Sequence, residues 1–348
     1  MASQTGWDHG VTDRTPLIES FLASANWANA QRHPLAGDAS SRRYERLSHP
    51  DHPNSAVLMD APISAAGSVT PFVRIAAVLA QHGLRPPEIL AQDLPNGLLL
   101  LEDFGDALFT QVLQDDTGDE RELYRAATDV LCQLHTLKPM SDLSLLDAEE
   151  LTQLATLPWQ WYPVHEGVDR TAAMAQYVER FQPLLHENLP QENVLIHRDY
   201  HAGNLIWLPE NTGTARVGLL DFQDAVRGPR AYDLVSLLQD ARRDVPSNIE
   251  DQMKAHFLAH SPQDQLGFER TYALLGFQRN LRIVGIFARL CLRDAKPHYL
   301  EYLPRVWAHM MRNLDHPVLA PMRPLIHAAF PSPSKSLVQE LKHQCPAP

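Results

Sequence analysis

Three polar side chains of the types that phosphoryl transfer requires stand close together in the sequence. Asp199 and Asn204 lie in His197-Arg-Asp-Tyr-His-Ala-Gly-Asn204, and Asp221 opens Asp221-Phe-Gln-Asp224. Phosphoryl transfer needs a carboxylate that accepts a hydroxyl proton, and an amide and a second carboxylate that hold a metal ion on the nucleotide phosphates. Mg²⁺ prefers such oxygen ligands. We therefore predict Asp199 as the catalytic residue and Asn204 and Asp221 as the metal ligands.

Two short strands should bring Asn204 and Asp221 together. The apolar segments 205–208 and 216–220 are separated by a turn that contains Pro and Gly, which predicts a β-hairpin. Antiparallel strands lie about 4.8 Å apart, so the residue before the first strand and the residue after the second become neighbours. Asp199 precedes Asn204 by five residues in the same loop. A loop whose polar residues only fix a turn is the alternative interpretation.

These residues resemble the catalytic loop and the metal-binding segment of the protein-kinase-like fold. His197, Asp199 and Asn204 match the catalytic loop, and Asp221-Phe222 matches the metal-binding pair that follows it. The detail resembles the aminoglycoside phosphotransferase family, whose members phosphorylate small molecules. The combination of the loop, the hairpin and the acidic pair is more specific than the loop alone.

The resemblance implies an α+β, bilobal protein-kinase-like fold with a small β-rich N-lobe and a larger, mostly helical C-lobe. We expect the N-lobe to span residues 1–103 and bind the nucleotide, and the C-lobe to span residues 104–348, catalyse the reaction and bind the acceptor. In the family, the strand that we predict over residues 97–104 runs into the hinge where adenine binds. Glu102 and Phe104 match that position, so we predict both as nucleotide-binding residues.

A loop of small residues near the start of the chain can approach phosphates. It separates two segments with strand character, and its backbone amides and hydroxyls can donate to phosphate oxygens. An ordinary hairpin turn explains the same residues equally well. The resemblance favours the phosphate interpretation, because a kinase-like chain has its phosphate loop near its start. Ser40 and Ser41 are the predicted phosphate-binding residues of this loop.

The next predicted strand lacks the lysine that neutralises the nucleotide phosphates in the wider fold. Met59 or Asp60 stands at that position, and the chain has no lysine before Lys138. Arg42 and Arg43 are the available cations, and guanidinium groups suit phosphate oxygens. Alternation along the strand favours Arg43 as the replacement. A solvent-exposed arginine pair is an equal alternative.

The segment after the hairpin favours a small acceptor molecule. Between Asp224 and Asp233 there is too little chain for the activation loop and peptide shelf of a protein kinase. In the family, an Asp at the position of Asp233 braces the catalytic loop, whereas the local pattern alone predicts Asp233 as the N-cap of a helix over residues 234–243. Together with Asp224 we predict His201, within the catalytic loop, as an acceptor-binding residue.

Two further regions offer contacts to a sugar. Trp161 and Tyr162 belong to an aromatic cluster between two prolines, and aromatic faces suit the apolar faces of sugar rings. Packing in the core is the more ordinary explanation for both rings. A predicted long helix near the C-terminus carries Arg279, Arg282 and Arg289 on one flank. The default interpretation is that these arginines are exposed to solvent. The alternative is that they bind an anion, and we predict Arg279 as the substrate-binding residue.

Five stretches that span most of the chain share a narrower resemblance. They are Gly37-Asp-Ala-Ser-Ser-Arg-Arg-Tyr44, Val57-Leu-Met-Asp-Ala-Pro62, His197-Arg-Asp-Tyr-His-Ala-Gly-Asn204, Leu219-Leu-Asp-Phe-Gln-Asp-Ala225 and Gln278-Arg-Asn-Leu-Arg-Ile-Val-Gly-Ile-Phe-Ala-Arg289. They resemble the bacterial anomeric kinases of N-acetylmuramate and N-acetylglucosamine in peptidoglycan recycling. This resemblance implies that ATP and Mg²⁺ are used to phosphorylate the anomeric hydroxyl, giving a sugar 1-phosphate. It also implies that the missing lysine is a trait of the subgroup.

Two classes of alternative remain open at this stage. An aminoglycoside, choline or homoserine kinase would share the same catalytic loop. A nucleotide-binding pseudokinase would explain the missing lysine, but the presence of Asp199, Asn204 and Asp221 opposes it. Polycationic acceptors would need an acidic pocket, whereas the carboxylate of N-acetylmuramate suits Arg279.

Composition limits the cellular setting and the partners. The 348 residues, 44% of them hydrophobic, are enough for one to three globular domains. A net charge of −12 with scattered acidic residues argues against nucleic-acid binding. Three cysteines without CxxC spacing fit a reducing compartment. No apolar run approaches the ~18 residues of a membrane span, and the N-terminus lacks a signal pattern, so we expect a cytoplasmic protein without membrane contact.

The oligomeric state and the C-terminal segment are predicted only from general expectations. The sequence does not define an oligomeric state, and a monomer is the default. The residues past 330 contain several prolines and are expected to form a loosely held tail.

Overall fold

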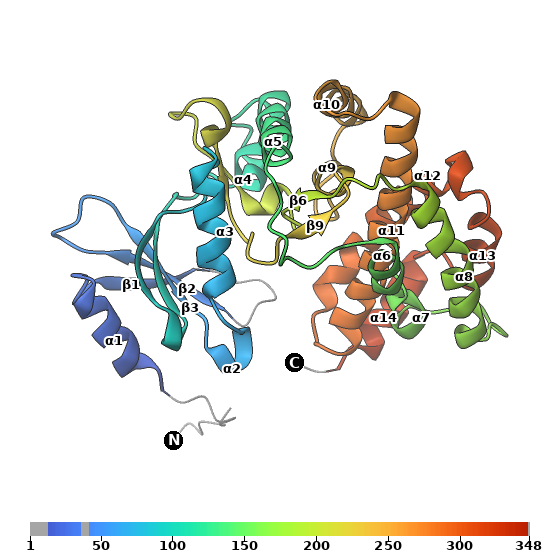
Figure 1. Ribbon diagram of the computed structural model, residues 1–348. Coiled ribbons are helices and arrows are strands. Elements are labelled where there is room, and N and C mark those ends of the chain that lie inside the picture. The colour runs from blue at the N-terminus through green and yellow to red at the C-terminus, as the bar shows by residue number, and fades with distance from the viewer. Residues whose placement is uncertain (1–12, 36–41, 347–348) are drawn as a thin grey trace, which may run out of the picture. The chain divides into compact units, whose positions relative to one another are not determined.

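The computed structural model describes residues 13–35 and 42–346, and the chain divides into two compact units. The first unit comprises residues 1–78 and 86–105, and the second comprises residues 79–85 and 106–348. Within the described residues, the first unit is built around a five-stranded antiparallel sheet and the second is mostly helical (Figure 1). The predicted α+β class is therefore confirmed.

The sheet of the first unit has the strand order β1-β2-β3-β5-β4, with every neighbouring pair antiparallel. Its strands are β1 (Gln31–Leu35), β2 (Arg43–Ser48), β3 (Ala56–Asp60), β4 (Ile89–Asp93) and β5 (Leu98–Glu102). The helices of this part of the chain are α1 (Thr15–Ser24), α2 (Ile63–Ala66) and α3 (Thr70–Gln81), with a short 3-10 turn at Leu94–Asn96. The strand predicted over residues 97–104 is thus confirmed as β5.

Side chains that alternate along the strands give the sheet two buried faces. Leu58 and Leu100 point to the face on which α1 packs through Phe21. Met59 and Leu99 are Cα partners on β3 and β5 and have no exposed surface. Because successive side chains on a strand point to opposite faces, these two residues lie on the other face of the sheet. The run of four leucines in β5 is therefore buried on both sides.

The second unit is organised around the 28-residue helix α11 (Gln265–Leu292). This helix packs against α7, α9 and α12 (Figure 1). The other α-helices of the unit are α4 (Phe109–Gln114), α5 (Glu120–Leu134), α6 (Ala148–Leu154), α7 (Leu157–Trp161), α8 (Arg170–Asn188), α9 (Ala231–Leu238), α10 (Ser247–Ala259), α12 (Leu303–Leu314), α13 (Arg323–Ala329) and α14 (Lys335–Gln344). None of the described helices is long and apolar enough to cross a membrane.

Four short strands in the second unit position the candidate site. Strand β7 (Leu205–Trp207) pairs antiparallel with β8 (Val217–Leu219), which confirms the predicted hairpin. Strand β6 (Val194–Ile196) pairs with β9 (Val226–Gly228), and the sequence analysis did not predict this pairing. The catalytic motif lies between β6 and β7, so each of its ends is held by a strand pair.

The C-terminal segment is more ordered than the sequence indicates. Helix α14 begins after Ser334, whose hydroxyl accepts the Leu337 N–H at 3.2 Å. Leu341 is 1% exposed, and its carbonyl accepts the Cys291 thiol of α11 at 3.5 Å. The prediction of a loosely held tail past residue 330 is wrong, because an apolar residue of α14 is buried against the central helix.

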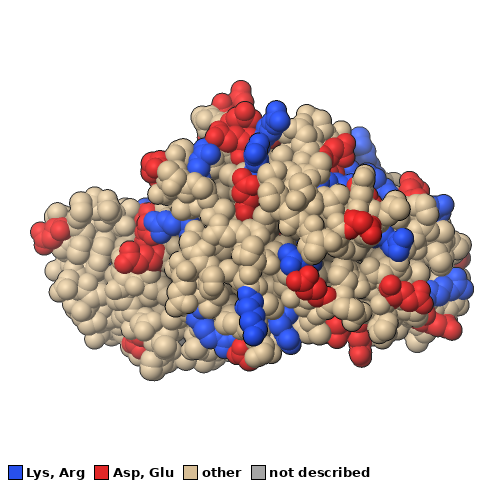
Figure 2. Space-filling model, turned by 45° about the horizontal axis from the view of Figure 1, so that its top comes forward, with Lys and Arg blue, Asp and Glu red and all other residues tan. Residues whose placement is uncertain are grey.

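Charged side chains are interspersed over the surface. On the face shown in Figure 2, Lys and Arg alternate with Asp and Glu among a majority of other residues. A surface of this kind lacks the single-sign stripe that nucleic-acid binding requires on that face.

Burial of His135 at the end of α5 makes stability depend on pH. The ring is 4% exposed and lies edge-on to Phe257, with ring centroids 5.5 Å apart. Neither ring nitrogen has a hydrogen-bond partner among the described residues. Burial, followed by the charge of Arg230, lowers the pKa of His135 to about 3. The unfolded chain therefore binds more protons than the folded chain below a pH of about 6.5, and stability is lost as the pH falls.

We expect His135→Leu to reduce the acid sensitivity of folding. At pH 4.5 His135 is protonated in the unfolded chain but not in the folded protein, which lowers the free energy of unfolding by about 3 kcal/mol relative to pH 7. The leucine variant lacks this loss. Urea unfolding at pH 7 and pH 4.5 measures the difference. The exposed His327→Gln serves as the control and should keep the wild-type difference. Equal acid sensitivity of His135→Leu and the wild type would contradict the assignment.

Candidate active site

The β7–β8 hairpin brings Asn204 and Asp221 next to each other. Leu205 and Leu219 are Cα partners in the hairpin, and the Leu220 N–H donates to the Asn204 carbonyl at 3.0 Å. Asp221 follows directly with a φ of 61°, in the left-handed region that a non-glycine residue rarely adopts. Such a conformation persists only where the surroundings fix it. The ends of the hairpin therefore bring Asn204 and Asp221 next to each other.

The catalytic loop also connects Asp199 to Asn204. The Asn204 Nδ2 donates to the Asp199 carbonyl at 2.9 Å. This bond uses the amide nitrogen and leaves the Asn204 Oδ1 available as a ligand for a cation. The side chain of Asp199 is exposed, so its carboxylate is open to an acceptor molecule.

The two carboxylates act on the same buried imidazole. His197 is 3% exposed, and burial lowers its pKa. The negative charges of Asp199 and Asp221 oppose this shift. The hydrogen bonds from the Asn204 Nδ2 to the Asp199 carbonyl and from the Leu220 N–H to the Asn204 carbonyl bring the chain at Asp199, Asn204 and Asp221 together in the second unit.

These donors fit Mg²⁺ bound together with a nucleotide. The Gln223 Nε2 donates to the Asp221 Oδ1 at 2.7 Å, and among the described residues the Asp221 Oδ2 has no hydrogen-bond partner. The described part of the chain contains no group of three or more His, Cys, Asp or Glu arranged to hold a metal ion. Mg²⁺ in proteins is commonly held by one or two carboxylates together with phosphate oxygens of a substrate, and Asn204 and Asp221 would suit such a site.

A buried carboxylate from α9 holds the start of the catalytic loop. The Asp233 Oδ2 accepts the His197 N–H at 2.5 Å, and its Oδ1 accepts the Arg198 N–H at 2.8 Å. Arg198 has a φ of 82°. Burial raises the pKa of Asp233 to about 7, and the two N–H donors oppose that shift. Helix α9 begins at Ala231, so the predicted helix start at residue 234 and the capping role of Asp233 are wrong.

Two of the predicted acceptor-binding residues lie beside this loop. His201 is 8% exposed, and its Nε2 lies 3.4 Å from the Asn204 Nδ2. Burial, followed by the charges of Arg242 and Arg279, lowers the pKa of His201 to about 3, so the ring is uncharged at neutral pH. Asp224 is exposed, and its Oδ2 accepts the Gln223 Nε2 at 3.3 Å.

Arg279 is not on a solvated flank. It is 8% exposed, and burial lowers the pKa of its guanidinium, while Tyr232, Asp199 and Asp240 oppose the shift. The solvated-flank interpretation is therefore wrong for Arg279. The structure places it within electrostatic reach of Asp199.

The two aromatic residues differ in their surroundings. Trp161 ends α7 and is half-buried. Tyr162 has no exposed surface, and its hydroxyl donates to the Pro331 carbonyl at 3.0 Å. Its ring lies 5.9 Å from that of Trp307 and 6.0 Å from that of Phe330. Both the ring and the hydroxyl of Tyr162 therefore make contacts within the second unit.

The predicted nucleotide-binding residues belong to the first unit. Ser40 and Ser41 lie outside the described residues. Arg43 is the first residue of β2 and is exposed, with Asp60 as its Cα partner on β3. Glu102 ends β5, and its Oε2 accepts the Glu88 N–H at 3.1 Å. Phe104 follows the strand and is half-buried.

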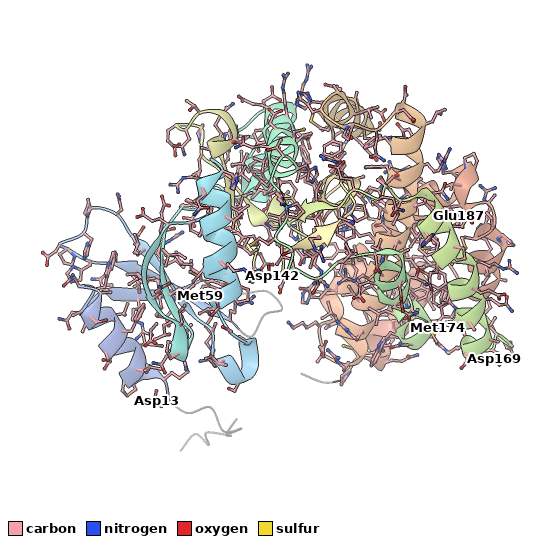
Figure 3. The ribbon with its side chains drawn as sticks, in the orientation of Figure 1. Asp13, Met59, Asp142, Asp169, Met174 and Glu187 are labelled. Carbon is pink, nitrogen blue, oxygen red and sulfur yellow. The ribbon has the colours of Figure 1, made fainter. Side chains whose placement is uncertain are left out.

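The strand position that lacks a lysine is filled by an apolar and an acidic residue. Met59, labelled in Figure 3, lies in β3 and is fully buried. Asp60 is 5% exposed and pairs with Arg14 at 2.8 Å. Arg46 on β2 is paired with Asp103 at 2.6 Å. Among the described residues Arg43 has no such ion pair, so its guanidinium is open to a phosphate.

Sequence reasoning missed two residues beside the site, Asp240 and Arg242. Both follow α9, and the Asp240 Oδ1 accepts the Arg242 N–H at 2.9 Å. The Arg242 Nη1 lies 3.4 Å from the His201 Nε2. No local motif marks these positions. Their place beside the catalytic loop depends on how α9 packs against the loop, which sequence spacing does not show.

Comparison with known structures defines the class of protein. A choline/ethanolamine kinase family protein from Mesorhizobium loti superposes with a TM-score of 0.60 at 11% identity, covering 94% of this chain and 99% of that one. An aminoglycoside phosphotransferase from Streptomyces rimosus, solved with ADP and streptomycin, superposes with a TM-score of 0.52 at 18% identity, covering 76% and 98%. The fold is that of the protein-kinase-like phosphotransferases.

Sequence comparison gives the family and a nearer relative. The profile of the phosphotransferase enzyme family matches residues 31–273, and the chain belongs to this family. A relative from Caulobacter vibrioides named N-acetylmuramate/N-acetylglucosamine kinase is 36% identical over 355 residues, covering 90% of this chain and 95% of the relative.

We expect Asp233→Ala to destabilise the protein and to release the start of the catalytic loop. Two buried backbone N–H groups lose a charged acceptor, which costs about 3 kcal/mol. Urea unfolding measures the loss, and amide hydrogen exchange at His197 and Arg198 measures the release. The control is Asp264→Ala, which removes the N-cap of α11 and should cost about 1 kcal/mol without changing exchange in the loop. Equal effects of the two variants would show that Asp233 does not brace the loop.

Proposed function

We propose that the chain is an ATP-dependent kinase of N-acetylated amino sugars. It phosphorylates the anomeric hydroxyl of N-acetylmuramate, N-acetylglucosamine or both, and the sugar 1-phosphate is used in cell-wall recycling. The observation that carries this proposal is the meeting of Asp199, Asn204 and Asp221 at the ends of the β7–β8 hairpin. The relative with 36% identity over 90% of this chain supports the choice of acceptor.

The catalytic residues have separate roles in this reaction. Asp199 orients the anomeric hydroxyl and accepts its proton, because its carboxylate is exposed at the mouth of the loop. Asn204 and Asp221 hold Mg²⁺ through the Oδ1 and the carboxylate that the loop leaves available. When bound, Mg²⁺ neutralises the charge that develops on the transferred phosphoryl group. Catalysis then depends mainly on positioning and charge neutralisation.

The first unit supplies the nucleotide contacts in this proposal. Ser40 and Ser41 donate to the phosphates, and Arg43 replaces the missing lysine. Support for Arg43 comes from its exposure at the start of β2, beside a strand whose own acidic residue is already paired with Arg14. Glu102 and Phe104, at the end of β5, contact the adenine.

The second unit supplies the acceptor contacts. We assign Trp161 to the aromatic wall of the sugar site, whereas Tyr162, predicted as a sugar contact from the sequence, is fully buried and its hydroxyl donates to Pro331. His201 offers a neutral imidazole to sugar hydroxyls, and Asp224 offers an acceptor. Arg279 adds a positive charge. A polycationic antibiotic or choline would be repelled by this charge, whereas a carboxylated sugar would be attracted.

The setting of the proposed enzyme is the cytoplasm, where ATP is available, and its working form is the monomer. Support for the location comes from the three cysteines without CxxC spacing, which suit a reducing compartment. A monomer is sufficient because the second unit alone contributes Asp199, Asn204 and Asp221.

An acceptor panel tests the proposed function. ADP release is measured with N-acetylmuramate, N-acetylglucosamine, an aminoglycoside, choline and homoserine, each with Mg²⁺ and with EDTA. We expect turnover with an N-acetylated amino sugar and Mg²⁺ alone, and the product should be a 1-phosphate by phosphorus NMR. Turnover of choline or an antibiotic would replace the proposed acceptor. Nucleotide binding without turnover of any acceptor would indicate a pseudokinase.

We expect Asp199→Asn to lose turnover by about a thousandfold or more while keeping nucleotide affinity. The amide cannot accept the hydroxyl proton, and a positioned acid–base group contributes about 10²- to 10⁴-fold. Initial rates and ATP titration measure the two quantities. The exposed Asp251→Asn on α10 is the matched control and should leave both unchanged. Near-wild-type turnover in Asp199→Asn would remove Asp199 from the catalytic role.

A further inference from the structure

The guanidinium of Arg279 on α11 is buried and incompletely hydrogen-bonded, and the charge of Asp199 acts on it. Its Nη1 has no hydrogen-bond partner among the described residues, and the side chain is 8% exposed. Buried charges in proteins are normally paired, because leaving one unpaired is costly. A missing partner at the edge of a reaction site points to a ligand that supplies the acceptor.

The acidic residues near Arg279 are already engaged with backbone donors. The carboxylate of Asp233 accepts the N–H groups of His197 and Arg198. The Asp240 Oδ1 accepts the Arg242 N–H at 2.9 Å. These bonds occupy both oxygens of Asp233 and one oxygen of Asp240, whereas the buried Asp240 Oδ2, like the Arg279 Nη1, has no hydrogen-bond partner among the described residues. The Arg279 Nη1 therefore remains available to a bound molecule.

Two further arginines lie around Arg279 and its neighbouring carboxylates, Asp199 and Asp240. Arg282 lies on the same helix, and its Nη1 donates to the Tyr232 hydroxyl at 3.3 Å. The Arg242 Nη1 lies 3.4 Å from the His201 Nε2 on the catalytic loop. Three guanidinium groups around one edge of the catalytic loop suit an anionic group on the acceptor.

A buried network of hydrogen-bonded amides holds the end of α9 against the part of α11 that carries Arg279. The Gln239 Oε1, directly before Asp240, accepts the Asn280 Nδ2 at 2.7 Å and the Asn313 Nδ2 at 2.8 Å. All three amides are buried. Asn280 directly follows Arg279, so the network fixes the end of α9 against the part of α11 that carries the arginine. A binding group supported in this way keeps its geometry without a ligand.

Building on the proposed function, we propose that Arg279 binds the lactyl carboxylate of N-acetylmuramate and makes the chain prefer this acidic sugar to N-acetylglucosamine. The lactyl group is attached to C3 of the ring whose C1 hydroxyl reacts. The carboxylate therefore reaches only a short distance from the reacting oxygen. This matches a guanidinium that lies within electrostatic reach of Asp199 without belonging to the metal site.

The test pairs a change in the protein with a change in the sugar. The kcat/KM for N-acetylmuramate, its methyl ester and N-acetylglucosamine is measured with the wild type and Arg279→Gln. In the wild type we expect the acid to exceed the ester by about ten- to hundredfold, the range for a hydrogen bond to a charged group. In Arg279→Gln the acid and the ester should become nearly equal, mainly through a higher KM for the acid. Non-additive losses of this kind identify a direct contact.

A matched variant on the same helix controls for charge and burial. Arg289 is half-buried and lies ten residues along α11, about 15 Å from Arg279. Arg289→Gln should keep the wild-type ratio of acid to ester. Arg279→Lys keeps the charge and loses the planar fork, so an intermediate ratio is expected. If Arg279→Gln does not fold, as judged by circular dichroism, Arg279→Lys carries the comparison, and an unchanged ratio overturns the proposal.

The outcomes separate this proposal from the proposed function. If Arg279→Gln lowers turnover of all three sugars by the same factor, the arginine acts on Asp199 or on the phosphates, and the carboxylate proposal is overturned. If the wild type turns over the ester as well as the acid, only the role of Arg279 is overturned. If the wild type turns over none of the three sugars, the proposed function itself is wrong.

Discussion

One buried carboxylate fixes the conformation on which the catalytic loop depends. Asp233 accepts the N–H groups of His197 and Arg198, and the second of these residues has a positive φ. Side chains rarely tolerate that backbone conformation unless the surroundings hold it. The loop that leaves this brace leads to Asn204, whose carbonyl then accepts the Leu220 N–H. The conformation of the site thus depends on backbone N–H groups that are accepted by the Asp233 carboxylate and by the Asn204 carbonyl.

Local patterns were sufficient to predict the elements that frame the site. The β7–β8 hairpin follows from two apolar runs around a Pro- and Gly-containing turn. Strands β4 and β5 follow from apolar segments on either side of an Asn-Gly turn. In each case the signal lies within a few residues of the element that it predicts. Hydrophobic periodicity and turn chemistry are local properties, so a single sequence displays them.

Features that depend on distant packing could not be predicted in the same way. The pairing of β6 with β9 joins segments on either side of the hairpin. Helix α14 was predicted as a tail because prolines lie before and after it in the sequence. The burial of Leu341 beside Cys291 depends on distant packing, which the local sequence does not show. Arg279 looked solvated because helical periodicity shows which residues share a face and not what covers that face. Asp240 and Arg242 lie beside the site only because α9 ends there.

The amide network of Gln239, Asn280 and Asn313 lies beside charged residues but contains no charge itself. Its hydrogen bonds hold the end of α9 against α11 and α12, one residue away from the charged positions 240 and 279. Evolution can therefore exchange the charges at those positions without disturbing how the helices fit. A family that keeps one phosphate chemistry while changing its acceptor would benefit from such a division. Divergence among its members should then concentrate at the charged neighbours and spare the amides.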